Sequence, residues 1–244
     1  MIWALTTTKR ETAAEKLLNI DFAEPLAFLD YVAVGRLDPD AVAALVGGVA
    51  AGCREAGCAL VGGETAEHPG LMEPGTFDLA GTCIGIVERS KLLDGTAARA
   101  GDVILGLPSS GLHANGFSLV RTLLAEWDIP LDRPYQEQLA RTLGDAGRDA
   151  ALAAEPGHAL ATVGDVLLEP TRIYARRVLA VRDTLNAVGH DLPGVAHITG
   201  GGLPGNVPRA LPPALGARLD TGRWPMPSVL RVLGALGGID DAEL

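Results

Sequence analysis

Apolar side chains recur every three or four residues in several parts of the chain, which is the spacing of an amphipathic helix. The clearest example runs from Asp38 to about Ala56, and its apolar positions fall on one face: Val42, Leu45, Val46 and Val49. Asp38 is a suitable N-cap and Pro39 suits the first helical turn, so we predict a core-facing helix there. The same spacing predicts helices over residues 117–127, 173–185 and 226–236. Shorter helices are expected over residues 11–20 and 206–211, and Asp240 is expected to cap another.

Short apolar runs predict strands between these helices. The longest cover residues 26–34, which are apolar apart from Asp30, and residues 77–88; shorter ones cover residues 58–61, 103–107, 195–198 and 217–219. Residues 128–158 contain three prolines and are expected to form a loop or a broken helix. Strands that alternate with helices indicate an α/β or α+β architecture. The polar, turn-prone stretch 89–100 is the candidate domain boundary.

Three glycine-bearing loops rich in polar groups are the strongest functional signal: residues 62–70, 109–116 and 197–202. Each follows an apolar run predicted to be a strand, and the last two precede a predicted helix. Glycine lets backbone N–H groups approach a ligand closely, and a helix N-terminus adds a partial positive charge. The loops therefore favour a phosphorylated substrate or a nucleotide as ligand, with plain turns as the alternative.

The composition narrows the class of protein. Of the 244 residues, 48% are hydrophobic and 20% are charged, which supports a folded core in one large domain or two of ordinary size. The net charge of −10 argues against nonspecific binding to nucleic acid, which needs basic patches, but leaves a small anionic ligand open. The three cysteines form no Cys-x-x-Cys pair and are expected to be reduced thiols, and no apolar run reaches about 18 residues. We therefore expect a soluble, cytoplasmic protein without a membrane partner.

Five segments, in the same order along the chain, resemble characteristic segments of the phosphoribosylformylglycinamidine cyclo-ligases, a family also called aminoimidazole ribonucleotide synthetases. They are AEPLAFLDY (23–31), GCALVGGETAE (57–67), GLPSSGLHANGFSLVR (106–121), EPTRIY (169–174) and AHITGGGL (196–203). The triple glycine alone is a weak signal. The ordered set is specific, and the resemblance covers residues 22–244.

The resemblance implies an enzyme of purine biosynthesis that uses ATP and Mg²⁺ to close the imidazole ring of its substrate. In that reaction ATP activates the formyl amide oxygen as an iminophosphate, an internal amine attacks, and the oxygen leaves as phosphate. The implied fold is α/β (α+β) with two domains, in which the N-terminal domains pair in a homodimer with a shared barrel. We therefore expect a non-matching segment at residues 1–22, part of an N-terminal ATP-side and dimerisation domain at 23–95, and a C-terminal α/β substrate-side domain at 96–244.

The sequence departs from the family pattern in three places. Upstream of Phe28 the family carries an Asp-Gly-Val-Gly-Thr-Lys loop and a Val-Asn-Asp stretch for ATP and metal, and residues 1–21 contain neither. The family also continues beyond Leu244 with a Phe-Asn-Met-Gly segment, and His68 stands where the family usually has Met. We therefore expect an incomplete N-terminal domain and a C-terminal domain truncated at its end, as in a fragment, a gene with a misplaced start, or a degenerate copy.

Two groups of candidate site residues follow. Asp30 and Glu64 are candidates for ATP or metal, because hard cations prefer carboxylate oxygens; the alternative for Asp30 is a structural hydrogen bond. The candidates for binding the ribotide come from the second and third loops and the EPTRIY segment: Ser110, Gly111, His113, Asn115, Thr171, His197, Gly200, Gly201 and Gly202. Helix capping is the alternative for Asn115 and Thr171, and a satisfied core histidine is the alternative for His197. The catalytic residues stay unassigned, since the sequence has no Ser-His-Asp order, zinc spacing or Walker loop.

The leading hypothesis is therefore ATP-dependent ring closure of formylglycinamidine ribonucleotide to aminoimidazole ribonucleotide, with the ribotide and ATP as small-molecule partners and Mg²⁺ as cofactor. A homodimer through the N-terminal domain is expected if that domain is complete. The first alternative is a catalytically incomplete fragment or vestige that binds the ribotide, which the absent ATP loop favours. The second is another member of the same ATP-using superfamily, such as a selenide or thiamine-phosphate kinase, which the segments at 111–113 and 170–174 argue against.

Overall fold

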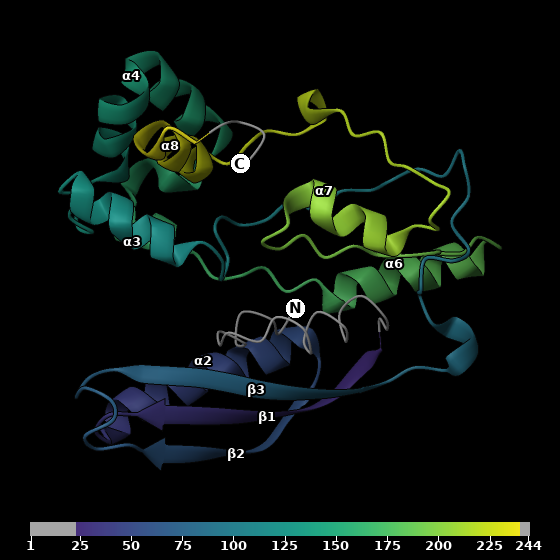
Figure 1. Ribbon diagram of the computed structural model, residues 1–244, viewed down its shortest axis with the longest axis horizontal. Coiled ribbons are helices and arrows are strands. Elements are labelled where there is room, and N and C mark those ends of the chain that lie inside the picture. The colour runs from purple at the N-terminus through teal and green to yellow at the C-terminus, as the bar shows by residue number, and fades with distance from the viewer. Residues whose placement is uncertain (1–22, 240–244) are drawn as a thin grey trace. The chain divides into compact units, whose positions relative to one another are not determined.

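The protein is described by a computed structural model over residues 23–239. These residues form two compact units, each assembled from segments that are far apart in the sequence (Figure 1). The first unit takes in the described part of Met1–Val103 with Ile173–His197 and Gly205–Gly216; the second takes in Ile104–Arg172, Ile198–Pro204 and the described part of Ala217–Leu244. The expected mixture of helices and strands is confirmed. The helix expected over residues 11–20 and the cap expected at Asp240 lie outside the described residues.

A three-stranded mixed sheet is the framework of the first unit, in the order β2-β1-β3 (Figure 1). The central strand β1 (Glu24–Val34) runs parallel to β2 (Ala59–Glu67) and antiparallel to β3 (Phe77–Ile86). The strands predicted over residues 26–34 and 77–88 are confirmed. The prediction of a short buried strand over residues 58–61 is wrong in extent and burial, because β2 continues to Glu67 as a mostly exposed edge strand.

Helix α2 (Pro39–Ala56) connects β1 to β2, because parallel neighbouring strands need a crossover connection. Its predicted start is confirmed: the Asp38 carboxylate accepts hydrogen bonds from the N–H groups of Asp40 and Ala41, at 3.0 and 3.2 Å. Gly57 ends the helix with a φ of 85°, a left-handed conformation that glycine adopts at little cost. Local sequence signals therefore fix both ends of this helix.

The core of the first unit lies between α2 and the sheet. Its buried side chains are Phe28, Val49, Cys53 and Ala56, and those partly buried against them are Cys58, Leu60, Cys83 and Ile173. All three cysteines are free thiols, as the sequence predicts. Of the four apolar positions predicted to face the core from α2, only Val49 is fully buried. The buried contacts of α2 therefore lie in its C-terminal half.

Helix α6 (Ala175–Ala187) also belongs to the first unit and buries Val178. It lies close to the end of α2, since a Cβ atom added to Gly57 would lie 2.6 Å from Nε of Arg176. This helix confirms the one predicted over residues 173–185, except that it begins at Ala175 and ends at Ala187. The region predicted as a helix over 206–211 instead holds the end of the short helix α7 (Gly202–Asn206) and a 3₁₀ helix, Val207–Ala210.

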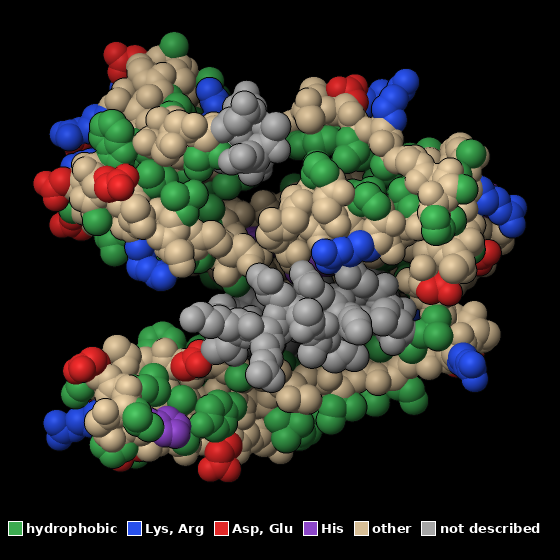
Figure 2. Space-filling model, viewed as in Figure 1, with side chains coloured by type: hydrophobic (Ala, Val, Ile, Leu, Met, Phe, Trp, Pro, Cys, Tyr) green, Lys and Arg blue, Asp and Glu red, His purple; other side chains and the backbone are tan. Residues whose placement is uncertain are grey.

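Large hydrophobic side chains remain exposed on all three strands of the sheet. They are Leu26, Leu29 and Tyr31 on β1, Val61 on β2, and Phe77, Ile84 and Ile86 on β3. Figure 2 shows hydrophobic side chains spread over the part of the surface that the strands form. An apolar surface of this kind is typical of an interaction face.

Helices alone build the core of the second unit (Figure 1). They are α3 (Phe117–Glu126), α4 (Tyr135–Ala154), α5 (Val163–Leu167) and α8 (Ser228–Gly237). Their buried side chains are mostly aliphatic, and Leu139 of α4 and Val166 of α5 are among the least exposed. The helices predicted over residues 117–127 and 226–236 are confirmed.

Helix α4 occupies most of the region expected to be a loop or a broken helix. Two prolines precede it and Pro156 follows it, so none of the three interrupts it. Gly144 breaks its regular geometry with a φ of 74°, which agrees with the broken-helix alternative. No helix within residues 23–239 has both the length and the apolar character needed to cross a bilayer.

Three of the predicted strands are not formed. Residues 103–107, 195–198 and 217–219 have no regular secondary structure, and the described sheet offers them no neighbour. A strand needs a paired neighbour for its N–H and C=O groups, so an apolar run alone does not make one. In the first of these segments, Val103 is 83% exposed and Leu105 is 73% exposed.

Candidate functional site

The loop of residues 109–116 enters α3 in the second unit through two left-handed backbone positions. His113 has a φ of 57° and Gly116 has a φ of 81°. Left-handed backbone is uncommon for a residue other than glycine, although histidine is among the residues enriched there. The conformation of His113 is therefore held by its surroundings and not by its own preference.

A hydrogen bond within the loop fixes the imidazole of His113. The backbone N–H of Ser110 donates to Nε2 of His113 at 3.0 Å. Nε2 is thus an acceptor without a proton, so a neutral ring carries its proton on Nδ1. Burial, followed by the positive charge of Arg172, lowers the pKa of His113 below its usual 6.5. The loop therefore favours a neutral His113.

Two hydrogen bonds join this loop to the segment of residues 169–172. The Ser110 hydroxyl donates to the carbonyl of Pro170 at 2.7 Å. The Arg172 guanidinium donates from Nη1 to the carbonyl of Pro108 at 3.0 Å. The structure therefore brings the candidates Ser110, Gly111 and His113 onto the segment that contains Thr171.

The capping alternatives for Asn115 and Thr171 are wrong. The N-cap of α3 is Gly116, and the N-cap of α6 is Tyr174; neither helix has a side-chain cap. Asn115 is exposed and its backbone N–H makes a long turn contact with the carbonyl of Leu112, at 3.5 Å. Both residues therefore stay candidates for ligand contact.

The sequence predicted that the third glycine loop follows a strand and precedes a helix, and the structure has the helix without the strand. The N–H of Gly202 donates to the carbonyl of Thr199 at 2.8 Å, and this turn leads into α7. Gly200, Gly201 and Gly202 belong to the second unit, whereas His197 belongs to the first and is partly buried there. The expected strand before the loop is absent, so the loop does not sit at the end of a sheet strand.

The first glycine loop is largely a strand, which corrects the expectation of a loop at residues 62–70. Gly62, Gly63 and Glu64 lie within β2, where Gly63 pairs with Asp30 and Glu64 pairs with Tyr31. Paired residues share a face of the sheet and successive residues alternate between faces. Asp30 and Glu64 therefore point to opposite faces.

These carboxylates do not assemble a cation site. Asp30 shares the α2-facing side with Phe28, while Glu64 shares the other side with Tyr31. Within residues 23–239, no group of three or more His, Cys, Asp or Glu side chains could hold a metal ion. Among the described residues of the first unit, Asp30 and Glu64 therefore do not fit as joint ligands of one Mg²⁺ ion, although the resemblance implies this cofactor.

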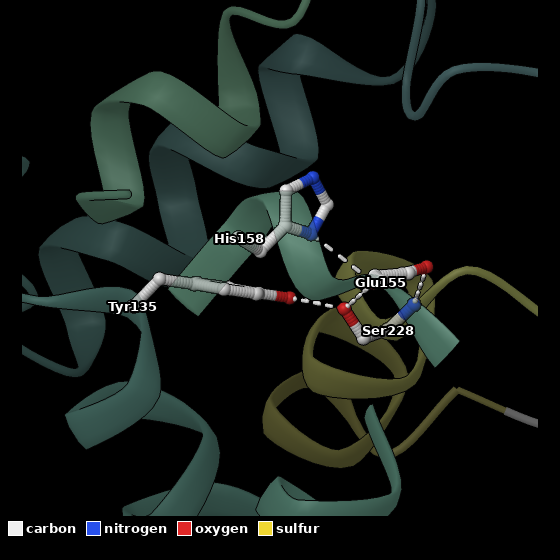
Figure 3. Close-up of polar contacts among 4 residues, drawn as sticks. All are labelled: Tyr135, Glu155, His158 and Ser228. Atoms are coloured by element: carbon white, nitrogen blue, oxygen red, sulfur yellow. Dashed lines mark hydrogen bonds and ion pairs between the residues drawn. The ribbon is translucent and has the colours of Figure 1, made fainter. Parts of the chain in front are cut away.

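Sequence reasoning missed a polar cluster formed by the buried Tyr135 and Ser228 and the partly exposed Glu155 and His158 (Figure 3). The Glu155 carboxylate accepts from the Ser228 N–H at 3.0 Å and from the Ser228 hydroxyl, and lies 3.2 Å from Nδ1 of His158. These contacts cap the N-terminus of α8 from the end of α4. Ser228 is 3% exposed, and the cluster connects the end of α4 to the start of α8 beside a pocket that Glu155 and Ser228 help to line. Only the spacing of Glu155 and His158, three residues apart, signals it in the sequence.

Most of the chain matches a known protein family. Residues 22–87 match the N-terminal domain, and residues 99–235 the C-terminal domain, of the AIR synthase related protein family. A phosphoribosylformylglycinamidine cyclo-ligase of Sorangium cellulosum (strain So ce56) is 49% identical over 222 residues, which are 91% of this chain and 57% of the relative. A protein of the same name from Anaeromyxobacter sp. (strain Fw109-5) is 46% identical over 91% of this chain and 57% of its own length. Another, from Thermosynechococcus vestitus (strain NIES-2133 / IAM M-273 / BP-1), is 45% identical over 91% of this chain and 58% of its own length. The chain thus spans a little over half the length of these relatives.

Proposed function

Because this chain belongs to the AIR synthase related protein family, we propose that it takes part in the ATP-dependent ring closure of formylglycinamidine ribonucleotide to aminoimidazole ribonucleotide. Relatives that are 45–49% identical carry the name of this cyclo-ligase, which supports the proposal. Since the chain spans 57% of the first of them, the activity of the whole enzyme is itself part of the proposal. The reaction belongs to purine biosynthesis, and we place it in the cytoplasm.

The loop of residues 109–116, held on the segment 169–172, is the proposed ribotide site. The two hydrogen bonds from Ser110 and Arg172 to Pro170 and Pro108 are the observation that carries this assignment. They fix a glycine-bearing loop at the start of α3, where backbone N–H groups and the partial positive charge of the helix favour a phosphate. Gly200, Gly201 and Gly202 of the third loop are proposed further contacts within the same unit, and His197 stays a separate candidate for ligand contact in the first unit.

The proposed chemistry is positioning and charge stabilisation at the reacting amide. Asn115 has an amide that donates to a phosphate or carbonyl oxygen, and a neutral His113 donates from Nδ1. ATP is the proposed second substrate, which makes the amide oxygen leave as phosphate. No step is assigned to Mg²⁺, because Asp30 and Glu64 lie on opposite faces of the sheet. A homodimer through the apolar surface of the sheet is the proposed assembly.

Coupled ADP release with the formylglycinamidine ribotide tests the activity. Turnover by this chain supports the full reaction. Activity only in a version lengthened to the span of its relatives supports the ring-closing role but shows that this chain carries part of the machinery. No turnover by either version contradicts the proposal.

Ribotide binding without catalysis is the second candidate function, and the divergence of Asp30 and Glu64 favours it. Calorimetry separates the two candidates, because this alternative predicts ribotide binding and no binding of Mg²⁺-ATP. The His113→Ala variant should lose ribotide affinity. The His190→Ala variant is the matched control, since His190 is exposed and lies in the other unit.

A further inference from the structure

Arg172 lies next to the candidate Thr171 and reaches the loop of residues 109–116. Its guanidinium spans from the segment 169–172 to the loop and donates to the carbonyl of Pro108 at 3.0 Å. Arg172 is only partly exposed, unlike most arginines of the chain. A charged donor in that position both anchors the loop and places a positive charge near the imidazole of His113.

The ring of His113 can keep its contact with Ser110 in only one protonation state. Nε2 accepts the N–H of Ser110 at 3.0 Å, and an imidazolium has no acceptor to offer. Protonation of His113 would therefore break the hydrogen bond that shapes the loop. The partial burial of the ring and the charge of Arg172 both oppose protonation.

We propose that Arg172 is a positioning residue of the ribotide site, which anchors the loop through Pro108 and keeps His113 as the neutral Nδ1–H tautomer. In this form the ring meets an oxygen of the ligand as a donor and not as an acceptor. The inference rests on the proposed function in one respect, since the ribotide is taken as the ligand. The tautomer and its dependence on Arg172 are properties of the unliganded chain.

Two charged side chains of the described residues lie at this loop, Arg172 and Glu169. Glu169 is exposed, and its Cβ lies 3.9 Å from the position that a Cβ atom on Gly111 would take. Its negative charge would favour a protonated His113, so it opposes the effect of Arg172. Burial, followed by the charge of Arg172, lowers the pKa of His113.

Nitrogen NMR of the histidine rings tests the proposal on the whole chain. The five histidines are assigned with single His→Gln variants, and the Nδ1 and Nε2 resonances of His113 are followed through a pH titration. The variants are Arg172→Gln, which removes the charge, and Arg172→Lys, which keeps it. Arg141→Gln is the matched control, because Arg141 is an exposed arginine of the same unit whose ion pair is with Glu137 on the surface of α4.

The expected result is an unprotonated Nε2 in the wild-type chain, with a His113 pKa below 6.5. Arg172→Gln should raise that pKa and mix the two tautomers, whereas Arg172→Lys and Arg141→Gln should leave the wild-type pattern in place. A proton on Nε2 in the wild type overturns the proposal without any variant. Equal titration curves in Arg172→Gln and Arg141→Gln overturn it as well.

Calorimetry with the ribotide separates this inference from the proposed function. Arg172→Gln should weaken ribotide binding by about 10-fold, the loss expected for one charge-assisted hydrogen bond, while Arg141→Gln binds like the wild type. If the wild type does not bind the ribotide, the ribotide site proposed on this chain fails, but the NMR result still decides the role of Arg172. If Arg172→Gln does not fold, the wild-type tautomer and the Arg172→Lys titration decide it.

Discussion

The hydroxyl of Tyr135 lies 2.9 Å from the hydroxyl of Ser228, although 93 residues separate them in the sequence (Figure 3). Tyr135 begins α4 and Ser228 begins α8, and both side chains are buried, at 2% and 3% exposure. Glu155, at the end of α4, accepts from Ser228 on its other side. This connection ties the two ends of α4 to the start of the last helix of the second unit.

Removal of either hydroxyl should destabilise the second unit. Tyr135→Phe is expected to lower the free energy of unfolding by about 1 kcal/mol, and Ser228→Ala by about 1–3 kcal/mol, because the second change leaves a buried phenol without its partner. Urea unfolding followed by tryptophan fluorescence measures both, since Trp127 donates to the carbonyl of Leu236 within the same unit. The double variant should cost less than the sum of the two, and a simple sum would show that the hydroxyls do not interact.

Alkaline pH should weaken the fold through the same tyrosine. Burial raises the pKa of Tyr135 from 10.0 to about 12. The unfolded chain releases this proton at lower pH than the folded chain, so the stability is fully present below pH 10 and is lost as the pH rises towards about 12. The free energy of unfolding of Tyr135→Phe should fall less steeply in this window than that of the wild type. Tyr31→Phe, which changes an exposed tyrosine of the other unit, should keep the wild-type slope.

Gly63 and its neighbour Gly62 should respond differently to alanine. A Cβ atom on Gly63 would lie 1.8 Å from Oδ1 of Asp30 and 2.7 Å from its carbonyl oxygen, whereas one on Gly62 meets nothing within 4 Å. Gly63→Ala should therefore lower the free energy of unfolding by about 1–3 kcal/mol, the usual cost of overpacking. Gly62→Ala is the matched control and should be neutral or slightly stabilising. Asp30→Ala should rescue Gly63→Ala only in part, because the contact with the carbonyl oxygen remains. Equal stability of the two glycine variants would contradict this view of the β1–β2 contact.

Cys53 should be the least reactive of the three thiols. It is 2% exposed, and burial, with Cys58 beside it, raises its pKa to about 12. Since the thiolate is the nucleophile, alkylation by iodoacetamide near neutral pH should modify Cys53 about tenfold or more slowly than the partly exposed Cys58. Mass spectrometry of digests measures the three rates, and urea should make them equal. Rapid labelling of Cys53 in the folded chain would contradict the burial of this core.

Mild acid should reduce stability through His113. Burial and the charge of Arg172 lower its pKa below 6.5, so the unfolded chain binds this proton at a higher pH than the folded chain. The stability from the neutral ring is fully present above pH 6.5 and is lost as the pH falls through the folded-state pKa. Unfolding measured between pH 7.5 and 5 should show a smaller loss in His113→Gln than in the wild type. The same slope in both would mean that His113 has an unchanged pKa on folding.

Local signals in the sequence determined several elements of this protein almost completely. Asp38, Pro39 and Gly57 mark the ends of α2, since capping depends on residues within one helical turn. The apolar periods of α3 and α8 and the strand patterns of β1 and β3 were likewise sufficient to place them. The five ordered segments indicated the family, which the matches to both of its domains confirm.

Only the tertiary structure decided how the polar residues meet, because that depends on packing between distant segments and on strand register. Pairing in register sends Asp30 and Glu64 to opposite faces, so two carboxylates that looked like one site in the sequence are separated. Folding of the second unit brings Arg172 to Pro108, and Tyr135 to Ser228, across 64 and 93 residues. The apolar run at residues 103–107 has strand-like residues but no neighbour, and strand formation needs a partner that no local pattern can supply.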